Sequence, residues 1–274
     1  MELQGTALLV MAVTGALFGA GLALASHKLA VKVDPRVVKV RDVLPGANCG
    51  ACGFPGCDGL ADAIVLGKSA PDACPVGGAE CAEAIASIMG LAIDLSAERK
   101  VAQIKCGGGK DVCQERSVYV GIEDCKAAVL AGDGAKACSF GCLGLGTCVR
   151  VCPFDAMKMG EDGLPIVDED KCTACGKCVA ECPRKIIELV GLSKKVHVRC
   201  KNTQRGAAAR KICKVACIGC QACVRVCPTK AIQVENFLAF IDYDLCDNCG
   251  ACVEKCPTKA IEDTRKRAAE QAAS

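Results

Sequence analysis

The feature that most constrains the fold of this 274-residue chain is a repeated run of cysteines. Three segments follow the pattern C-x2-C-x2-C-x3-C-P without deviation, at 172–183, 217–228 and 246–257. A fourth, degraded run comprises Cys142, Cys148 and Cys152, with Cys138 just upstream. Three thiolates at this spacing reach three corners of one iron–sulfur cube, while the cysteine before proline turns away toward a second cube. The runs therefore predict [4Fe–4S] clusters bound in pairs.

Within each pair, the fourth cysteines are exchanged between the two runs. The predicted ligand sets are Cys217, Cys220, Cys223 and Cys256; Cys246, Cys249, Cys252 and Cys227; Cys172, Cys175, Cys178 and Cys152; and Cys142, Cys148 and Cys182, with Cys138 as the expected fourth ligand. Zinc and disulfides are the competing uses of so many cysteines. Zinc ribbons use C-x2-C in separated pairs rather than in triples. Disulfides explain neither the triples nor the proline.

The cysteine pattern repeats itself about 75 residues further along the chain, which indicates two copies of one module. Positions 125, 138, 142, 148 and 152 recur as Cys200, Cys213, Cys217, Cys223 and Cys227. The counterpart of Cys220 is Leu145, so the first copy lacks its middle ligand; Cys138 is the nearest replacement and Cys125 the alternative. The cysteines left over near the modules either hold a sixth cluster or are buried thiols. They are Cys106, Cys113, Cys125, Cys200 and Cys213.

A different cysteine set precedes these runs, in and after the string NCGACGFPGCDGLADAI. Its members are Cys49, Cys52, Cys57 and Cys74, spaced C-x2-C-x4-C-x16-C. The interleaved glycines let the backbone approach a cluster closely and adopt positive φ. The set predicts a self-contained [4Fe–4S] site followed by a helix, with zinc as the rival metal. Cys81 lies at helical spacing in an apolar stretch, which predicts a core position.

Residues 6–26 carry no charge and would span about 31 Å as a helix, enough to cross a bilayer core. Lys28, Lys32 and Arg36 follow this segment, and only Glu2 precedes it. The positive-inside rule therefore predicts a single-pass anchor in the cell (inner) membrane, with the bulk of the chain facing the cytoplasm. A cleaved signal peptide is the rival interpretation. Its n-region would lack a positive charge, and exported thiols would meet an oxidising compartment.

The expected fold class is α+β: an N-terminal transmembrane helix, a small helical [4Fe–4S] domain and two tandem two-cluster ferredoxin-like modules. The expected boundaries are 1–27 for the anchor, 35–95 for the helical domain, 96–119 for a linker or part of an extra cluster site, 120–195 and 196–262 for the modules, and 263–274 for a charged tail. Only 3% of the residues are aromatic and none is tryptophan. Five clusters, with a sixth left open, are expected to serve as internal staples in place of an aromatic core.

The formal net charge of +3 counts every cysteine as neutral. Each [4Fe–4S]2+ core with four thiolates adds about −2, so five clusters bring the chain to about −7. Residues 194–230 nevertheless hold ten basic side chains and no acidic one. This region is either a docking surface for an acidic redox partner, a compensating charge for the clusters, or a solvated face. It has no interleaved aromatic residues, so no nucleic-acid partner is expected.

The sequence contains no motif for an autonomous catalytic site, and no catalytic residue is predicted. It has no G-x-G-x-x-G after a strand, no P-loop and no H-E-x-x-H. His27 and His197 have no partners nearby in the sequence. The chain is expected to move single electrons, whereas a two-electron hydride step would need a flavin elsewhere.

The order of an uncharged N-terminal helix, the Cys49–Cys74 motif and ferredoxin-type runs resembles the B subunit of the Rnf complex, a membrane ferredoxin:NAD+ oxidoreductase that pumps Na+ or H+. The second module and the pair Cys106 and Cys113 resemble its longer form. The resemblance implies that electrons pass from soluble reduced ferredoxin to other membrane and flavin-bearing subunits. Leu145 departs from the ferredoxin pattern. The alternatives are an iron–sulfur wire subunit of another membrane reductase or hydrogenase and, from a different class, a zinc-binding scaffold.

Overall fold

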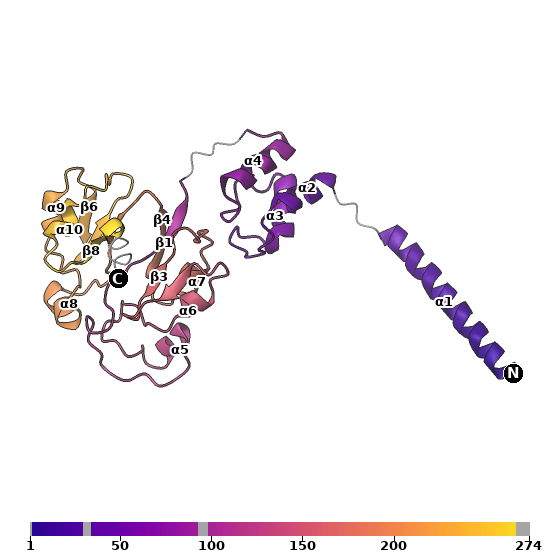
Figure 1. Cartoon of the computed structure of the whole chain (residues 1–274), viewed down its shortest axis with the longest axis horizontal. Coiled ribbons are helices and arrows are strands. Elements are labelled where there is room, and N and C mark those ends of the chain that lie inside the picture. Colours follow the sequence, from indigo (N-terminus) through magenta and orange to yellow (C-terminus); the bar gives the residue numbers. More distant parts are fainter. Residues whose placement is uncertain (1, 30–33, 93–97, 267–274) are drawn as a thin grey trace.

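The structure is a computed structural model that describes residues 2–29, 34–92 and 98–266. Helix α1 (Glu2–Leu29) extends away from the other elements (Figure 1). Within it, Leu9–Leu29 is the one segment in the described ranges that is long and apolar enough to cross a membrane. Its large apolar side chains from Leu9 onward are exposed to the surroundings rather than packed against protein. The segment overlaps the expected anchor.

Three helices form a small unit after α1: α2 (Pro35–Val43), α3 (Gly56–Val65) and α4 (Gly78–Met89). Asp34 begins the unit, because its carboxylate accepts the Arg36 backbone N–H at 2.8 Å and caps α2. The apolar faces of the three helices meet in a common core built around Val40, Leu60 and Ile85. The residues described between 34 and 92 contain no strand, as expected for a small helical domain.

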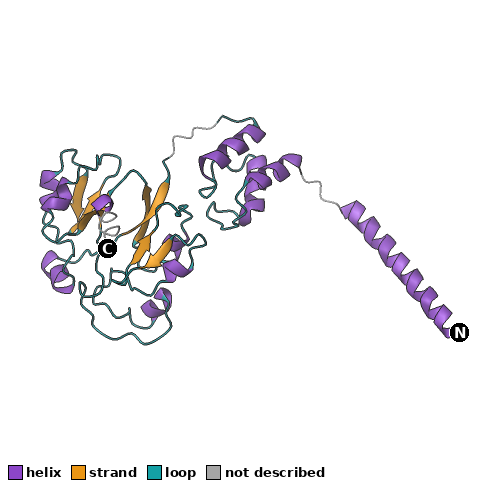
Figure 2. Ribbon diagram, viewed as in Figure 1, coloured by secondary structure: helices purple, strands orange, loops and turns teal. Residues whose placement is uncertain are grey.

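Residues 98–266 combine short helices with four two-stranded antiparallel sheets (Figure 2). In the first half, β1 (Lys100–Ile104) pairs with β4 (Ile187–Gly191), and β2 (Met157–Met159) forms a hairpin with β3 (Pro165–Val167). In the second half, β5 (Val196–Val198) pairs with β8 (Ile261–Asp263), and β6 (Ile232–Glu235) forms a hairpin with β7 (Leu238–Ile241). The helices are α5 (Cys125–Leu130), α6 (Thr147–Arg150), α7 (Lys177–Glu181), α8 (Gly206–Ile212), α9 (Ala222–Val226) and α10 (Ala251–Lys255). Both halves thus place three helices and a hairpin between an outer pair of strands.

The sequence predicted a linker or part of an extra cluster site over 96–119. Within that range, the structure forms strand β1 at residues 100–104. The register runs from Lys100 opposite Gly191 to Ile104 opposite Ile187, and positions 101–104 are all buried. The pairing satisfies the backbone hydrogen bonds of a segment whose partner is far away in the sequence. The segment 106–115, which follows β1, lies between the two halves.

Arg199 joins the second half to that segment. Its Nη1 pairs with Glu262 Oε2 at 2.6 Å, and its Nη2 donates to the Cys106 carbonyl oxygen at 2.9 Å. Its own carbonyl accepts the Gly107 N–H at 2.9 Å. The guanidinium is largely buried, so these charge-assisted contacts fix the position of Cys106 relative to both strands β5 and β8.

Candidate metal centres

The three complete cysteine loops share one backbone conformation. In each loop, the residue before the second cysteine and the residue after it have positive φ, namely Ala174 and Gly176, Gly219 and Gln221, and Asn248 and Gly250. Repeated left-handed residues in such loops form concavities of backbone N–H groups that bind anions, and many iron–sulfur sites use them. A cluster with four thiolates is an anion, so these loops fit the group that the cysteine pattern implies.

The degraded loop keeps this conformation without its middle cysteine. Gly144 and Gly146 have φ values of +80° and +69° on either side of Leu145. Glycine is the residue that adopts this region at no steric cost. The loop is therefore shaped for a cluster, and its missing ligand must come from another part of the chain.

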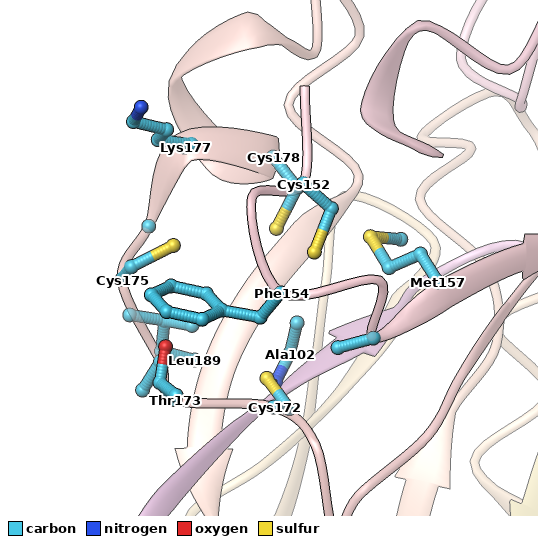
Figure 3. A pocket seen from close by; sticks show the side chains of 13 residues that line it. Ala102, Cys152, Phe154, Met157, Cys172, Thr173, Cys175, Lys177, Cys178 and Leu189 are labelled. Atoms are coloured by element: carbon cyan, nitrogen blue, oxygen red, sulfur yellow. The ribbon is translucent and has the colours of Figure 1, made fainter. Parts of the chain in front are cut away.

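The cysteines of one predicted set line a single cavity (Figure 3). They are Cys152, Cys172, Cys175 and Cys178, with Phe154 against them. Burial, followed by the neighbouring thiols, raises the pKa of Cys178 to about 12. The buried hydroxyl of Thr173 has no hydrogen-bond partner in the part of the chain that the structure describes. A buried hydroxyl needs an acceptor, and a cluster sulfur in this cavity would supply one.

Two further predicted sets line cavities of the same kind. One cavity is lined by Cys217, Cys220, Cys223 and Cys256, and a second by Cys49, Cys52, Cys57 and Cys74. In the second cavity, Asn48 Oδ1 accepts the Cys57 N–H at 2.8 Å and holds the loop against α3. The remaining predicted set is Cys246, Cys249, Cys252 and Cys227. Cys252 lies close enough to Cys246 and Cys249 to interact with them electrostatically, and Cys227 packs against the hydrophobic core that contains Cys252.

The structure places Cys125, and not the expected Cys138, around one cavity with Cys142, Cys148 and Cys182. Helix α5 begins at Cys125, because Asp124 Oδ1 accepts the N–H groups of Lys126 and Ala127 at 2.9 Å. The hydroxyl of Thr147 on α6 accepts the Cys125 N–H at 2.8 Å and donates to Asp124 Oδ2 at 3.0 Å. These hydrogen bonds hold Cys125 beside the loop in which Leu145 replaces the middle cysteine ligand. Sequence proximity favoured Cys138, but the cap at Asp124 decides the geometry.

Cys138 instead meets three of the cysteines left over by the sequence patterns. We call the set Cys106, Cys113, Cys138 and Cys213 the junction site, because it joins the segment 106–115 to both halves of the fold. Cys113 and Cys213 face each other in an isolated antiparallel bridge. Their thiols are hydrogen-bonded, which lowers the pKa of Cys113 and, together with burial, raises that of Cys213.

Two glycines shape the junction site around its sulfur atoms. A β-carbon at Gly108 would lie 3.1 Å from Cys213 Sγ, 3.3 Å from Cys113 Cβ and 3.8 Å from Cys106 Sγ. A β-carbon at Gly141 would lie 3.5 Å from Cys138 Sγ and 3.6 Å from Cys106 Sγ. The thiols of all four cysteines thus gather against two positions that carry no side chain. Four clustered cysteines are the donor set of a [4Fe–4S] cluster, so the site fits that group by its chemistry.

Two polar residues at the junction site carry no signal in the sequence. Lys136 is buried, and its Nζ donates to the Gly108 carbonyl at 2.8 Å. Asn202 is 1% exposed, and its side-chain amide lies 3.8 Å from Cys138 Sγ as a donor. A lysine and an asparagine outside any motif are typical of surface residues, so only their burial identifies them.

Cys200 and Cys81 lie outside these six sets. Cys200 is buried beside Cys217, and burial raises the pKa of its thiol to about 11. Cys81 lies in the core of the three-helix unit, where its thiol donates to the Val43 carbonyl at 3.5 Å. Its position agrees with the expected core role.

Replacing Cys81 by alanine is expected to leave the iron content of the chain unchanged while lowering its stability. The change deletes a buried sulfur from the helical core, which costs about 1 kcal/mol. Iron and sulfide analysis together with the thermal unfolding midpoint would measure both effects. Replacing Cys57 in the same way is the matched comparison and should lose a cluster. Loss of iron from the Cys81 variant would contradict the assignment.

Among the described residues, no three His, Cys, Asp or Glu side chains converge closely enough to hold a single metal ion. The cysteines line cavities in groups of four instead. A zinc ion draws its thiolates to about 2.3 Å, whereas the thiolates of a multi-atom cluster stand further apart.

Family comparisons agree with this chemistry. Residues 44–76 match an "Fe-S cluster" family. A "4Fe-4S dicluster domain" family matches residues 137–187 and again residues 201–261, and a second family of the same description matches residues 164–228. The matched ranges contain every cysteine run described above.

Relatives with assigned names match most of the chain. It is 55% identical over 237 residues to the B subunit of the Na(+)-translocating ferredoxin:NAD(+) oxidoreductase complex of Acetobacterium woodii, covering 86% of this chain and 71% of that protein. It is 44% identical over 237 residues to the B subunit of the ion-translocating oxidoreductase complex of Methanosarcina acetivorans, with coverages of 86% and 89%. It is 44% identical over 240 residues to the B subunit of the proton-translocating ferredoxin:NAD(+) oxidoreductase complex of Clostridium ljungdahlii, with coverages of 87% and 84%.

Ferredoxin-type loops around cysteine-lined cavities, together with 4Fe-4S domains, define an iron–sulfur electron-transfer protein. The chain belongs to the family of B subunits of the Rnf complex, the ion-translocating ferredoxin:NAD+ oxidoreductase. The resemblance noted in the sequence is thereby confirmed, and the chain has its role inside a multi-subunit oxidoreductase. Its N-terminal apolar helix is consistent with membrane association.

Proposed function

We propose that the chain is a membrane-anchored relay that takes electrons from reduced ferredoxin and passes them to the other membrane and flavin-bearing subunits of its complex. When bound, each cluster accepts and releases one electron, which no side chain of this chain can do. The protein supplies the cysteine ligands, the burial and the hydrogen bonds to sulfur that tune each site. Translocation of Na+ or H+ belongs to the complex as a whole.

The observation that carries this proposal is a continuous line of neighbouring cysteine sites through residues 98–266. Cys178 lies near Cys148, and so links the first two sets of the first half. The Cys142 N–H lies 3.3 Å from Cys106 Sγ, which links that half to the junction site. Cys200 lies near both Cys106 of the junction site and Cys217 of the second half, so these two sites are neighbours.

The last step of the line lies within the second half, where Cys252 is near Cys223. The proposed ligand sets along the line are Cys172, Cys175, Cys178 and Cys152; Cys142, Cys148, Cys182 and Cys125; Cys106, Cys113, Cys138 and Cys213; Cys217, Cys220, Cys223 and Cys256; and Cys246, Cys249, Cys252 and Cys227. With the N-terminal set Cys49, Cys52, Cys57 and Cys74 they make six clusters. Residues 120–195 with β1, and residues 196–262, are the proposed tandem modules.

The proposed orientation places the cysteine-bearing bulk in the cytoplasm. Lys28 lies in the last turn of α1 and Glu2 in its first, which supports that orientation under the positive-inside rule. The cytoplasm is reducing and keeps cysteine ligands free of disulfides. Soluble ferredoxin would reach the clusters on that side.

A groove beside the junction site is the proposed entry point for ferredoxin. Lys110, Lys211 and Lys214 line it with Cys113, together with the acidic residues Asp111 and Glu115, so its lining carries one net positive charge. Several basic residues of 194–230 are instead engaged within the chain: Lys195 pairs with Glu169, and Arg199 pairs with Glu262. The lysines that line the groove are exposed, which supports docking of an acidic partner there.

The proposal is tested by mixing the reconstituted full-length chain anaerobically with reduced ferredoxin and following cluster reduction by stopped-flow absorbance. Rapid reduction, slowed by salt, is the expected result. The variant Lys211→Glu should slow it about tenfold at low salt and flatten its salt dependence. The control Lys158→Glu makes the same charge change at an exposed site on β2. Equal rates for the two variants would exclude the groove, and no reduction by ferredoxin would exclude the donor.

A further inference from the structure

Lys136 is a buried lysine that pairs with no carboxylate among the described residues. Its side chain is 8% exposed, and the structure gives it no ion pair among the described residues. The one acceptor of its ammonium group there is the Gly108 carbonyl, at 2.8 Å. An ammonium group has three N–H donors, so two are left without an acceptor. Burying such a charge is costly unless an anion compensates it.

The backbone around Lys136 holds its side chain at the junction site. Residues 136 and 115 form an isolated antiparallel bridge, and the Ala137 N–H donates to the Gln114 carbonyl at 2.8 Å. Glu115, the acidic residue opposite, is exposed to solvent. Lys136 is therefore turned into the protein, against the loop whose Gly108 lies over Cys106, Cys113 and Cys213.

The carbonyl that Lys136 contacts belongs to the loop that faces the junction thiols. A β-carbon at Gly108 would lie 3.1 Å from Cys213 Sγ and 3.8 Å from Cys106 Sγ, and the Lys136 ammonium group lies 2.8 Å from the carbonyl oxygen of the same residue. A [4Fe–4S]2+ cluster with four thiolates carries a net charge of about −2 and is the anion that a buried lysine here requires.

We propose that Lys136 is the fixed positive charge of the junction site and raises the reduction potential of a cluster held by Cys106, Cys113, Cys138 and Cys213. The inference rests on the ligand set proposed above for that site. One electron from ferredoxin, or from dithionite in a titration, changes the net charge from about −2 to about −3, with no bond formed or broken. A nearby cation stabilises the more negative, reduced state more strongly.

Lys136 is on this account a positioning and tuning residue at the step that connects the two halves of the relay. The segment 106–115 and Cys213 come from different parts of the chain, so this site couples the modules. Asn202 also donates to Cys138 Sγ, but it carries no charge. A neutral residue at position 136 would therefore remove the positive charge from the site and leave the hydrogen bond from Asn202 in place.

The test is a potentiometric titration of the full-length chain with dithionite, monitored by electron paramagnetic resonance, on Lys136→Met, Lys136→Arg and the control Lys158→Met. The junction cluster is identified as the signal that disappears in Cys213→Ala. We expect Lys136→Met to keep its iron and to make that one cluster at least tenfold harder to reduce, a shift of about 59 mV for one electron. Lys136→Arg and Lys158→Met should titrate as the wild type does.

An unchanged potential in Lys136→Met at full iron content would overturn the role of Lys136 alone. If Lys136→Met loses about four iron atoms while Lys136→Arg keeps them, the charge is needed for assembly, which supports the proposal. Loss of iron in both variants would mean that side-chain shape matters rather than charge, and would overturn it. Equal iron in the wild type and Cys213→Ala would overturn the junction site itself, which is a failure of the proposed function.

Discussion

Replacing Cys213 by alanine is expected to lower the iron content of the anaerobically purified chain from about 24 to about 20 atoms, with an equal loss of acid-labile sulfide. The reason is geometric. Cys213 lies opposite Cys113 at the junction site, where no other described cysteine replaces its thiol. Without a fourth thiolate the cube loses a corner or fails to assemble.

The matched control for this prediction is Cys200→Ala. Cys200 is as buried as Cys213 and lies close in the sequence, but it stands beside Cys217, outside every proposed ligand set. Its variant should retain about 24 iron atoms.

Cys125→Ala should lose one cluster as Cys213→Ala does, since Cys125 completes the set at Leu145. A wild-type content of about 20 iron atoms, unchanged in Cys213→Ala, would reduce the chain to five clusters.

Chelating the iron under anaerobic conditions is expected to abolish cooperative folding of residues 98–266. Seven of the sixteen fully buried residues in the core around the second half are cysteines, and no fully buried core residue described in either half is aromatic. The strands have three to five residues, and each sheet has only two of them. Two-stranded sheets are marginal in water without further support.

Metal ligation in small domains contributes about 10 kcal/mol or more, which equals or exceeds the whole stability of a typical domain. Hydrogen exchange measured by mass spectrometry should therefore show the amides of β1, β4, β5 and β8 losing their protection after chelation. Helix α1, which contains no cysteine, is the internal control and should keep its protection in detergent. Strands that remain protected without iron would contradict the coupling of ligation to folding.

The sequence alone determined the chemistry of this protein, because cluster binding depends on ligand spacing within single loops. The C-x2-C-x2-C spacing and the glycines of the N-terminal motif set the local backbone, and three predicted sets lie around common cavities. The charge-free N-terminal segment likewise specified a helix that can cross a membrane, since its length and composition are local properties.

The tertiary structure alone decided which distant cysteines meet. Cys125 reaches the gap at Leu145 through the cap at Asp124, and Cys138 joins cysteines from a segment between the halves and from the second half. Strand β1 pairs with a strand far along the chain, which no local pattern predicts. The burial of Lys136 also depends on packing. Spacing fixes contacts within a loop, whereas contacts between loops follow from how the strands and helices pack around them.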